Sequence, residues 1–247
     1  MAELLGLVKS GFGRTALLGC ALVGCLMGSA PAAAQTTGAR DLAGVRLGAS
    51  PSEVESVLKA LDATFKFQTI YYPDTNGKAT SSIAVIKVAR AGDDIRGNSS
   101  RRNGFAVYFT ESNPQAYAIY REVANPQGIS TPQVLEDITK KYGPTLGYYQ
   151  DIYVRNHDAA GKPAANCSGH GFGWEGVPRA YDPQCGQALR VQFNPKAPGI
   201  AAGFQAWLFD HQLARPAIEA AQAKQQAAAQ EGQRRQQEAV RANRPAI

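Results

Sequence analysis

The chain twice shows the same pattern, a helix that begins at a proline and is followed by several short strands. The first helix is predicted over 51–61, because Ser50 precedes Pro51 and Glu53 completes a capping box. Apolar residues recur there at helical spacing. They are Val54, Val57, Leu58 and Leu61. We therefore expect one face of this helix to pack against the rest of the fold.

The second helix is predicted from Pro132 to Tyr142. Thr131 is the expected N-cap residue, and Gly143 followed by Pro144 ends the helix. Leu135, Ile138 and Tyr142 share one face of it.

Alternation of apolar and polar residues predicts strands after each helix. The segment 117–123 fits a strand or a helix, and we favour a strand. The other expected strands cover residues 65–71, 83–88, 105–109, 148–154, 187–193 and 204–209. The order predicts an α+β fold with antiparallel sheet. It forms either two related helix-plus-strands lobes, 42–124 and 125–210, or one sheet with both helices on one face.

Residues 1–34 have the pattern of a cleavable bacterial export signal. Lys9 and Arg14 precede an apolar run over 15–27, which is shorter than the roughly 20 residues of a membrane-spanning helix. Small residues then predict cleavage between Ala34 and Gln35. We expect a periplasmic or secreted protein.

Cys25 offers an alternative to cleavage after Ala34 and release of a protein without an anchor. The sequence Leu-Val-Gly-Cys over 22–25 resembles a lipobox, in which the cysteine is acylated and becomes the new N-terminus. The apolar run continues past Cys25 and the site at Ala34 is well formed, so we favour release. Membrane contact is expected only if Cys25 is acylated.

The net charge is mildly basic, +6 for the whole chain and +5 once Glu3, Lys9 and Arg14 are removed with the signal. No stripe of Lys and Arg interleaves with aromatic residues. Together with export, this argues against a nucleic-acid partner.

Removal of the signal leaves two cysteines, Cys167 and Cys185, in an oxidising compartment. We expect a disulfide that closes a loop of about 18 residues and contributes about 3 kcal/mol. His170 follows Cys167 by three residues, so a reactive thiol is the alternative. The disulfide would order the long Gly/Pro-rich loop 156–186.

This loop carries the best candidate contact surface, because exposed aromatic and arginine side chains are typical of binding hot spots. Its residues are His170, Trp174, Glu175, Arg179 and Tyr181, with Asp182 beside them. A structural role alone, or an acid–base pair of His170 and Glu175, is the alternative.

The sequence shows no catalytic constellation, metal-ligand spacing or phosphate-binding glycine loop. We therefore expect a non-enzymatic protein without a cofactor.

Residues 211–247 form a tail rich in Ala and Gln, for which we expect a solvated helix with an ion pair between Glu231 and Arg235. It has no sustained apolar seam, which argues against a coiled coil. A partner-binding helix is the alternative.

Residues 44–54 read GVRLGASPSEV. Over 44–61 the chain resembles the SmpA/OmlA (BamE-like) family of outer-membrane assembly lipoproteins and similarly built periplasmic proteins. Ala49 stands where that family usually has Met. The resemblance implies helices packed on a small antiparallel sheet. The expected function is binding of another envelope protein; a small-ligand or cell-wall-binding protein is the alternative.

Overall fold

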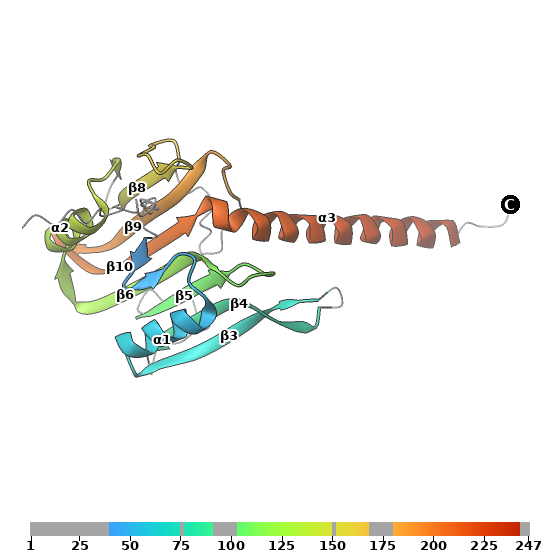
Figure 1. Cartoon of the computed structure of the whole chain (residues 1–247), viewed down its shortest axis with the longest axis horizontal. Helices are drawn as coiled ribbons and strands as arrows, with labels where there is room; N and C mark the ends of the chain where they lie inside the picture. Colours follow the sequence, from blue (N-terminus) through green and yellow to red (C-terminus); the bar gives the residue numbers. More distant parts are fainter. Residues whose placement is uncertain (1–39, 75–76, 91–102, 150–151, 168–179, 243–247) are drawn as a thin grey trace, which may run out of the picture. The chain divides into compact units, whose positions relative to one another are not determined.

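A computed structural model describes residues 40–74, 77–90, 103–149, 152–167 and 180–242. Within these residues, three helices accompany an eight-stranded antiparallel sheet and a two-stranded ribbon (Figure 1). The predicted α+β class and the C-terminal helix are thus confirmed. None of the described helices has the length and apolar character needed to cross a bilayer. The predicted cleavage site at Ala34 and Gln35, and Cys25, lie outside the described residues.

The strands lie in the order β3-β4-β5-β6-β10-β9-β8-β7. The segment 117–123 lies in β6, so it is a strand, as favoured. The single strand predicted over 148–154 was wrong: Tyr149 pairs with Ile152, so this stretch is a hairpin of β7 and β8. The bounds are β3 Phe65–Pro73, β4 Ala79–Arg90, β5 Gly104–Phe109, β6 Ala116–Ser130, β7 Gly147–Tyr149, β8 Ile152–Asp158, β9 Cys185–Ala197 and β10 Ile200–Asp210.

Each half of the sheet follows the same path, one helix and then a meander of four strands. Helix α1, Pro51–Leu61, precedes β3 to β6, and helix α2, Thr131–Tyr142, precedes β7 to β10. The halves join through their last strands, β6 and β10, which pair in the middle of the sheet. The two predicted lobes therefore share one continuous sheet, and the boundary expected between residues 124 and 125 falls inside β6.

Helices α1 and α2 pack on the same face of this sheet (Figure 1). From α1, Val54 and Leu58 are fully buried. From α2, Leu135 and Ile138 are partly buried against the same core. The buried strand residues of this core are Ile86, Val88, Phe105, Val107, Phe109, Ala116, Ile119, Tyr153, Leu189, Val191, Phe193, Ala201, Ala206 and Leu208. The apolar faces of α1 and α2 thus pack against the side chains that alternate residues of the strands place on one face of the sheet.

The start of α1 agrees with the capping box predicted from the sequence. Ser50 Oγ accepts a hydrogen bond from the Glu53 amide, and Glu53 Oε2 accepts one from the Ser50 amide at 2.7 Å. The predicted apolar face is too long by one residue, because Leu61 at the end of the helix is 46% exposed.

The start of α2 differs from the prediction by one residue. Ser130 is the N-cap, because its Oγ accepts a hydrogen bond from the Gln133 amide, and Thr131 is already the first helical residue. Either hydroxyl suits an N-cap, and the strand before the helix decides which one is used: Ser130 still pairs with Ile200 in β10. The helix ends at Tyr142, and Gly143 follows as its C-cap with φ at 91°, in agreement with the predicted end.

A short ribbon of β1, Asp41–Leu42, and β2, Val45–Arg46, lies against the same core through Leu42 and Val45. Asp41 ties it to α2. Its carboxylate lies 2.6 Å from Lys141 Nζ, and its carbonyl accepts a hydrogen bond from Tyr142 Oη at 2.6 Å.

Helix α3, His211–Ala242, begins on the opposite face of the sheet. Ala214 and Ile218 are buried there against strand residues that alternate with those of the first core, Ala106, Tyr108, Ala118 and Phe209. Beyond Ile218 the helix is almost entirely exposed.

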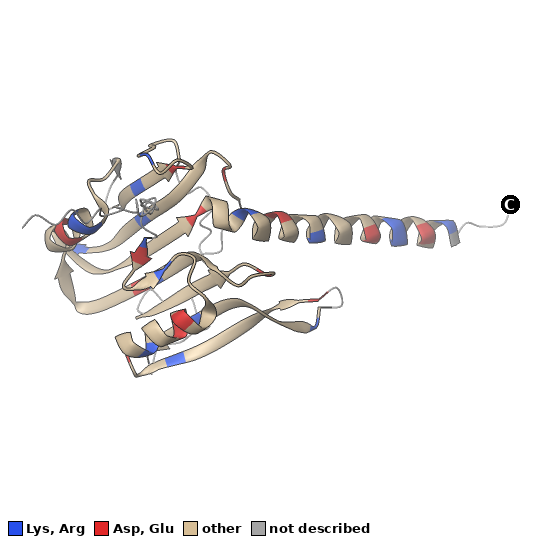
Figure 2. Cartoon of the chain, viewed as in Figure 1, with Lys and Arg blue, Asp and Glu red and all other residues tan. Residues whose placement is uncertain are grey.

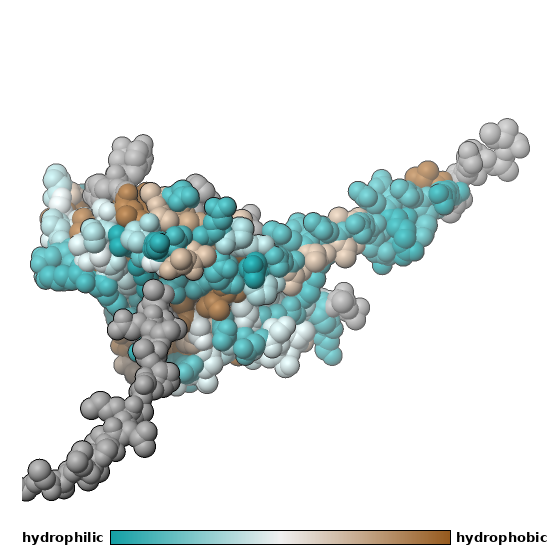
Figure 3. Space-filling model, turned by 45° about the horizontal axis from the view of Figure 1, so that its top comes forward, coloured by the Kyte–Doolittle hydropathy of each residue, from teal (hydrophilic) through white to brown (hydrophobic). Residues whose placement is uncertain are grey.

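The exposed part of α3 is stabilised by its own side chains. Glu231 binds both Arg234 and Arg235 at 2.8 Å, and Arg234 also binds Glu238. The predicted pair of Glu231 and Arg235 is thus confirmed. Opposite charges alternate along this part of the helix (Figure 2), and its surface is mainly hydrophilic (Figure 3). A helix that is polar on all sides relies on such pairs.

Candidate functional site

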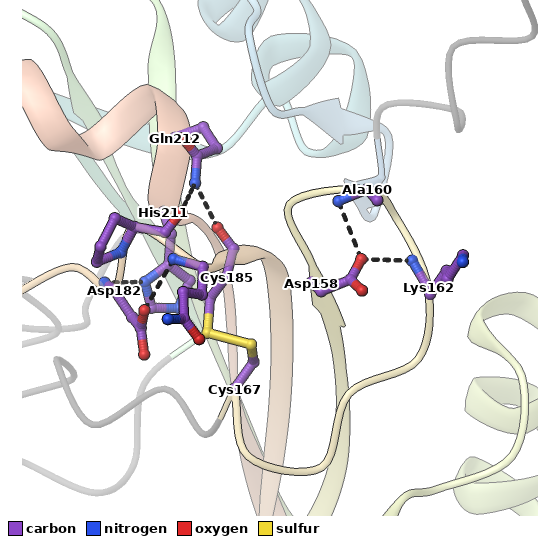
Figure 4. Close-up of a disulfide and its surroundings, with 10 residues drawn as sticks. Asp158, Ala160, Lys162, Cys167, Asp182, Cys185, His211 and Gln212 are labelled. Carbon is purple, nitrogen blue, oxygen red and sulfur yellow. Dashed lines mark hydrogen bonds between the residues drawn. A yellow bond between two sulfur atoms is a disulfide. The ribbon is translucent and has the colours of Figure 1, made fainter.

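Cys167 and Cys185 lie at disulfide distance, with their sulfur atoms 2.14 Å and their Cα atoms 5.4 Å apart (Figure 4). Both cysteines are buried. Cys185 is the first residue of β9 and pairs with Asp158 at the end of β8. The disulfide therefore anchors the segment after β8 to the start of β9. We call residues 156–167, 180–187 and 210–212 the disulfide corner.

Side chains at the start of α3 form hydrogen bonds with the disulfide corner. Gln212 Nε2 donates hydrogen bonds to the carbonyls of Pro183 at 3.0 Å and Cys185 at 2.7 Å. Asp210 caps the helix, since its Oδ1 accepts from the amides of Gln212 and Leu213. Its Oδ2 accepts from Gln187 Nε2 in β9 at 3.2 Å. The corner is thus fixed by a covalent bond and by a helix N-terminus.

His211, at the start of α3, is 97% buried (Figure 4). Its ring lies edge-on to that of Phe209, with the ring centroids 4.6 Å apart. Its Nδ1 accepts a hydrogen bond from the Asp182 amide at 2.9 Å. The neutral ring therefore carries its proton on Nε2, which has no hydrogen-bond partner among the described residues. Burial lowers the pKa of His211. The ring acts as a neutral, structural group.

A polar cavity of about 260 Å³ opens in the disulfide corner. Arg40 Nη2 lies 2.8 Å from His157 Nε2, so His157 must accept this hydrogen bond and is neutral. Burial, together with the charges of Arg40 and Arg155, lowers the pKa of His157. The walls are formed by Arg40, His157, Asp158, Ala159, Gly161, Gly186, Gln187, Asp210 and Gln212.

The cavity offers hydrogen-bond donors and acceptors, but the described part of its wall contains no Ser, Thr or Cys nucleophile. His157 already accepts from an arginine, and Asp210 is occupied by α3 and Gln187. This chemistry suits the recognition of a polar group more than proton transfer.

Of the predicted contact residues, Tyr181 and its neighbour Asp182 lie in the described part of the chain. Tyr181 Oη donates a hydrogen bond to Glu219 of α3, and this contact raises the pKa of Tyr181. Tyr181 thus joins the corner to α3 and stays only partly buried. His170, Trp174, Glu175 and Arg179 lie outside the described residues.

A second cluster lies in the middle of the sheet, on the face where α3 begins. Tyr120 in β6 and Trp207 in β10 contact each other with ring centroids 5.5 Å apart, and Arg190 in β9 lies over the Trp207 ring. Tyr120 Oη donates to Glu122 Oε2 at 3.1 Å, and Trp207 is 7% exposed. The sequence analysis did not predict this cluster. A signal was present, because Tyr120, Trp207 and Arg190 are each next to a residue of the opposite face, Ile119, Leu208 and Leu189 respectively, and so share one face of the sheet.

An open groove of about 440 Å³ runs along α1. Its walls come from residues between 44 and 57, including Gly44, Arg46 and Glu53. The residues that line this groove are distinct from those of the disulfide corner.

No family model matches the chain, and no curated protein or solved structure matches it either.

Proposed function

We propose that this chain is an exported, non-enzymatic module that binds another protein of the bacterial cell envelope. The signal pattern of residues 1–34 supports export. The disulfide distance between Cys167 and Cys185 suits an oxidising compartment. The proposed mature protein begins at Gln35 and is periplasmic or secreted. Anchoring through an acylated Cys25 is the alternative form of the same proposal.

The observation that carries this proposal is the construction of the disulfide corner. The disulfide, the two hydrogen bonds of Gln212 and the cap by Asp210 fix its backbone before any partner arrives. A surface that is ordered in advance loses less conformational entropy on binding. Its cavity adds polar groups that orient a partner, and Tyr181 adds an aromatic ring at its border with α3.

The same cavity supports a second candidate, a small-ligand or cell-wall-binding protein. Its volume of about 260 Å³ is close to the lower end of ligand sites, which begin at about 300 Å³. Its donors and acceptors would suit a small polar ligand or a peptidoglycan fragment.

Two similar turns provide a matched test of the protein-binding proposal. In one, Asp158 Oδ1 accepts from the Lys162 amide at 2.9 Å, beside the cavity; in the other, Asp74 Oδ1 accepts from the Lys78 amide at 2.8 Å, between β3 and β4. Both lysines are exposed. Lys162→Glu therefore reverses a charge at the corner, and Lys78→Glu makes the same change in a like turn elsewhere.

The purified protein is used to capture proteins from an envelope extract, which are then quantified by mass spectrometry. We expect a defined envelope protein whose recovery falls at least tenfold with Lys162→Glu and is unchanged with Lys78→Glu. Equal recovery by both variants would place binding elsewhere. Sedimentation with peptidoglycan, without capture of any protein, would favour the second candidate instead.

A further inference from the structure

The two edges of the eight-stranded sheet differ in length and in protection. The β7 edge has three residues, whereas β3 has nine, from Phe65 to Pro73. Among the described residues, β3 pairs only with β4. Short strands, charges and prolines are the usual protection of an edge. β3 has one charge, Lys66, and a proline only at its last residue, so it can pair with another strand.

The backbone of β3 shows which groups point outward. The Arg90 amide in β4 donates to Asn103 on the β5 side, so Arg90 does not exchange hydrogen bonds with Phe65 opposite it. The Phe65 amide accordingly points away from β4, toward the Asp62 carbonyl. These directions alternate along a strand. The register shift after Ile70 skips one residue of β4 and none of β3, so β3 itself keeps alternating. The amides and carbonyls of Phe67, Thr69 and Tyr71 therefore also point outward.

We propose that a second copy of this chain pairs with β3 as an antiparallel strand, with Thr69 opposite Thr69 of the second copy. This register centres the pairing on the middle residue of β3. It uses the outward amides of Phe67, Thr69 and Tyr71, whereas the Phe65 amide stays bonded to the Asp62 carbonyl. The two sheets become one continuous sheet about a twofold axis. The surface is separate from the disulfide corner, so this inference does not depend on the proposed function.

The side chains of β3 complement themselves in this register. Phe67 lies opposite Tyr71 of the second copy, on the face that carries α1. Aromatic pairs across strands are stabilising, and Tyr71 is 43% exposed in the single chain.

The charges also agree with this register. On the other face, Lys66 lies opposite Tyr72 of the second copy and diagonal to its exposed Asp74. A lysine beside an aromatic ring and an acidic residue is favourable, and no like charges face each other. A parallel pairing of two copies would instead bring their Lys66 side chains together. This complementarity favours a second copy over an unrelated strand.

Pairing along one strand buries little surface, so the dimer should be weak and concentration-dependent. Sedimentation of the purified protein over a range of concentrations should show its mass approach twice that of one chain. Over the same range of protein concentrations, hydrogen exchange at the amides of Phe67, Thr69 and Tyr71 should slow as the concentration rises.

Thr69→Lys places two like charges opposite each other on the twofold axis and should lower the association constant at least tenfold. Gln127→Lys adds the same charge at an exposed residue of β6 and should leave association unchanged. A monomer at every concentration would overturn the proposal. A dimer in which exchange at the β3 amides is unchanged would overturn it as well, whether or not a variant folds.

Discussion

His211 and His157 are both held neutral, but by different surroundings. His211 is enclosed beside Phe209 and accepts a hydrogen bond from a backbone amide. His157 is less buried and accepts from Arg40, whose charge would repel an imidazolium. Burial disfavours the charged form of each ring and is the main reason that the pKa values of both histidines are lowered in the folded protein.

This lowering makes the free energy of unfolding depend on pH. An unfolded histidine has a pKa of about 6.5 and takes up its proton before the folded one does. Stability is therefore highest above about pH 6.5 and decreases as the pH falls toward the lowered folded pKa values. Replacing His211 with Gln should flatten the decrease that urea unfolding records between about pH 7.5 and 5.5. An unchanged slope would show that His211 is not protected from protonation.

At the scale of elements, the start of α2 offers a direct comparison of two adjacent hydroxyls. Ser130→Ala removes the side chain that accepts from the Gln133 amide and should cost about 1 kcal/mol of unfolding free energy. Thr131→Ala should cost less, because Thr131 is inside the helix. Urea unfolding of the two variants measures both. The opposite ranking would show that Thr131 is the cap.

Helix α3 should consist of a packed start and an independent remainder. Ending the chain after Lys224 removes residues of α3 that are exposed apart from the partly buried Glu231, and it keeps the contact of Lys224 with Glu111. The melting temperature should therefore stay the same. Ile218→Ala, within the packed start, should cost about 2–4 kcal/mol. A large loss of stability on truncation would contradict this division.

Local patterns were enough to predict most elements. Ser50 and Glu53 act within one turn, and the alternation in β9 and β10 follows from one buried face. The order of the strands depends on distant pairing, such as Tyr120 with Trp207, which no local pattern specifies. For the same reason the cluster of Tyr120, Trp207 and Arg190 and the cavity beside Arg40 were missed. Each combines residues from segments far apart in the chain.

In the molecule as a whole, the described residues form two halves, each a helix followed by a meander, in one sheet. The disulfide links the end of one strand connection at a corner of this sheet. Because β6 and β10 pair over most of their length, the halves should unfold together. Closing a loop of about 18 residues should add about 3 kcal/mol to the free energy of unfolding. Reduction of the disulfide should remove this contribution.

The proposed function depends on export into an oxidising compartment, where Cys167 and Cys185 form the disulfide. Mass spectrometry of the intact protein purified from the envelope of the producing cell tests both parts at once. We predict a chain that begins at Gln35 and is two hydrogens lighter than its fully reduced form. An uncleaved chain in which Cys167 and Cys185 are both free thiols would contradict this prediction. An acylated N-terminus at Cys25 would show that the protein is anchored to a membrane.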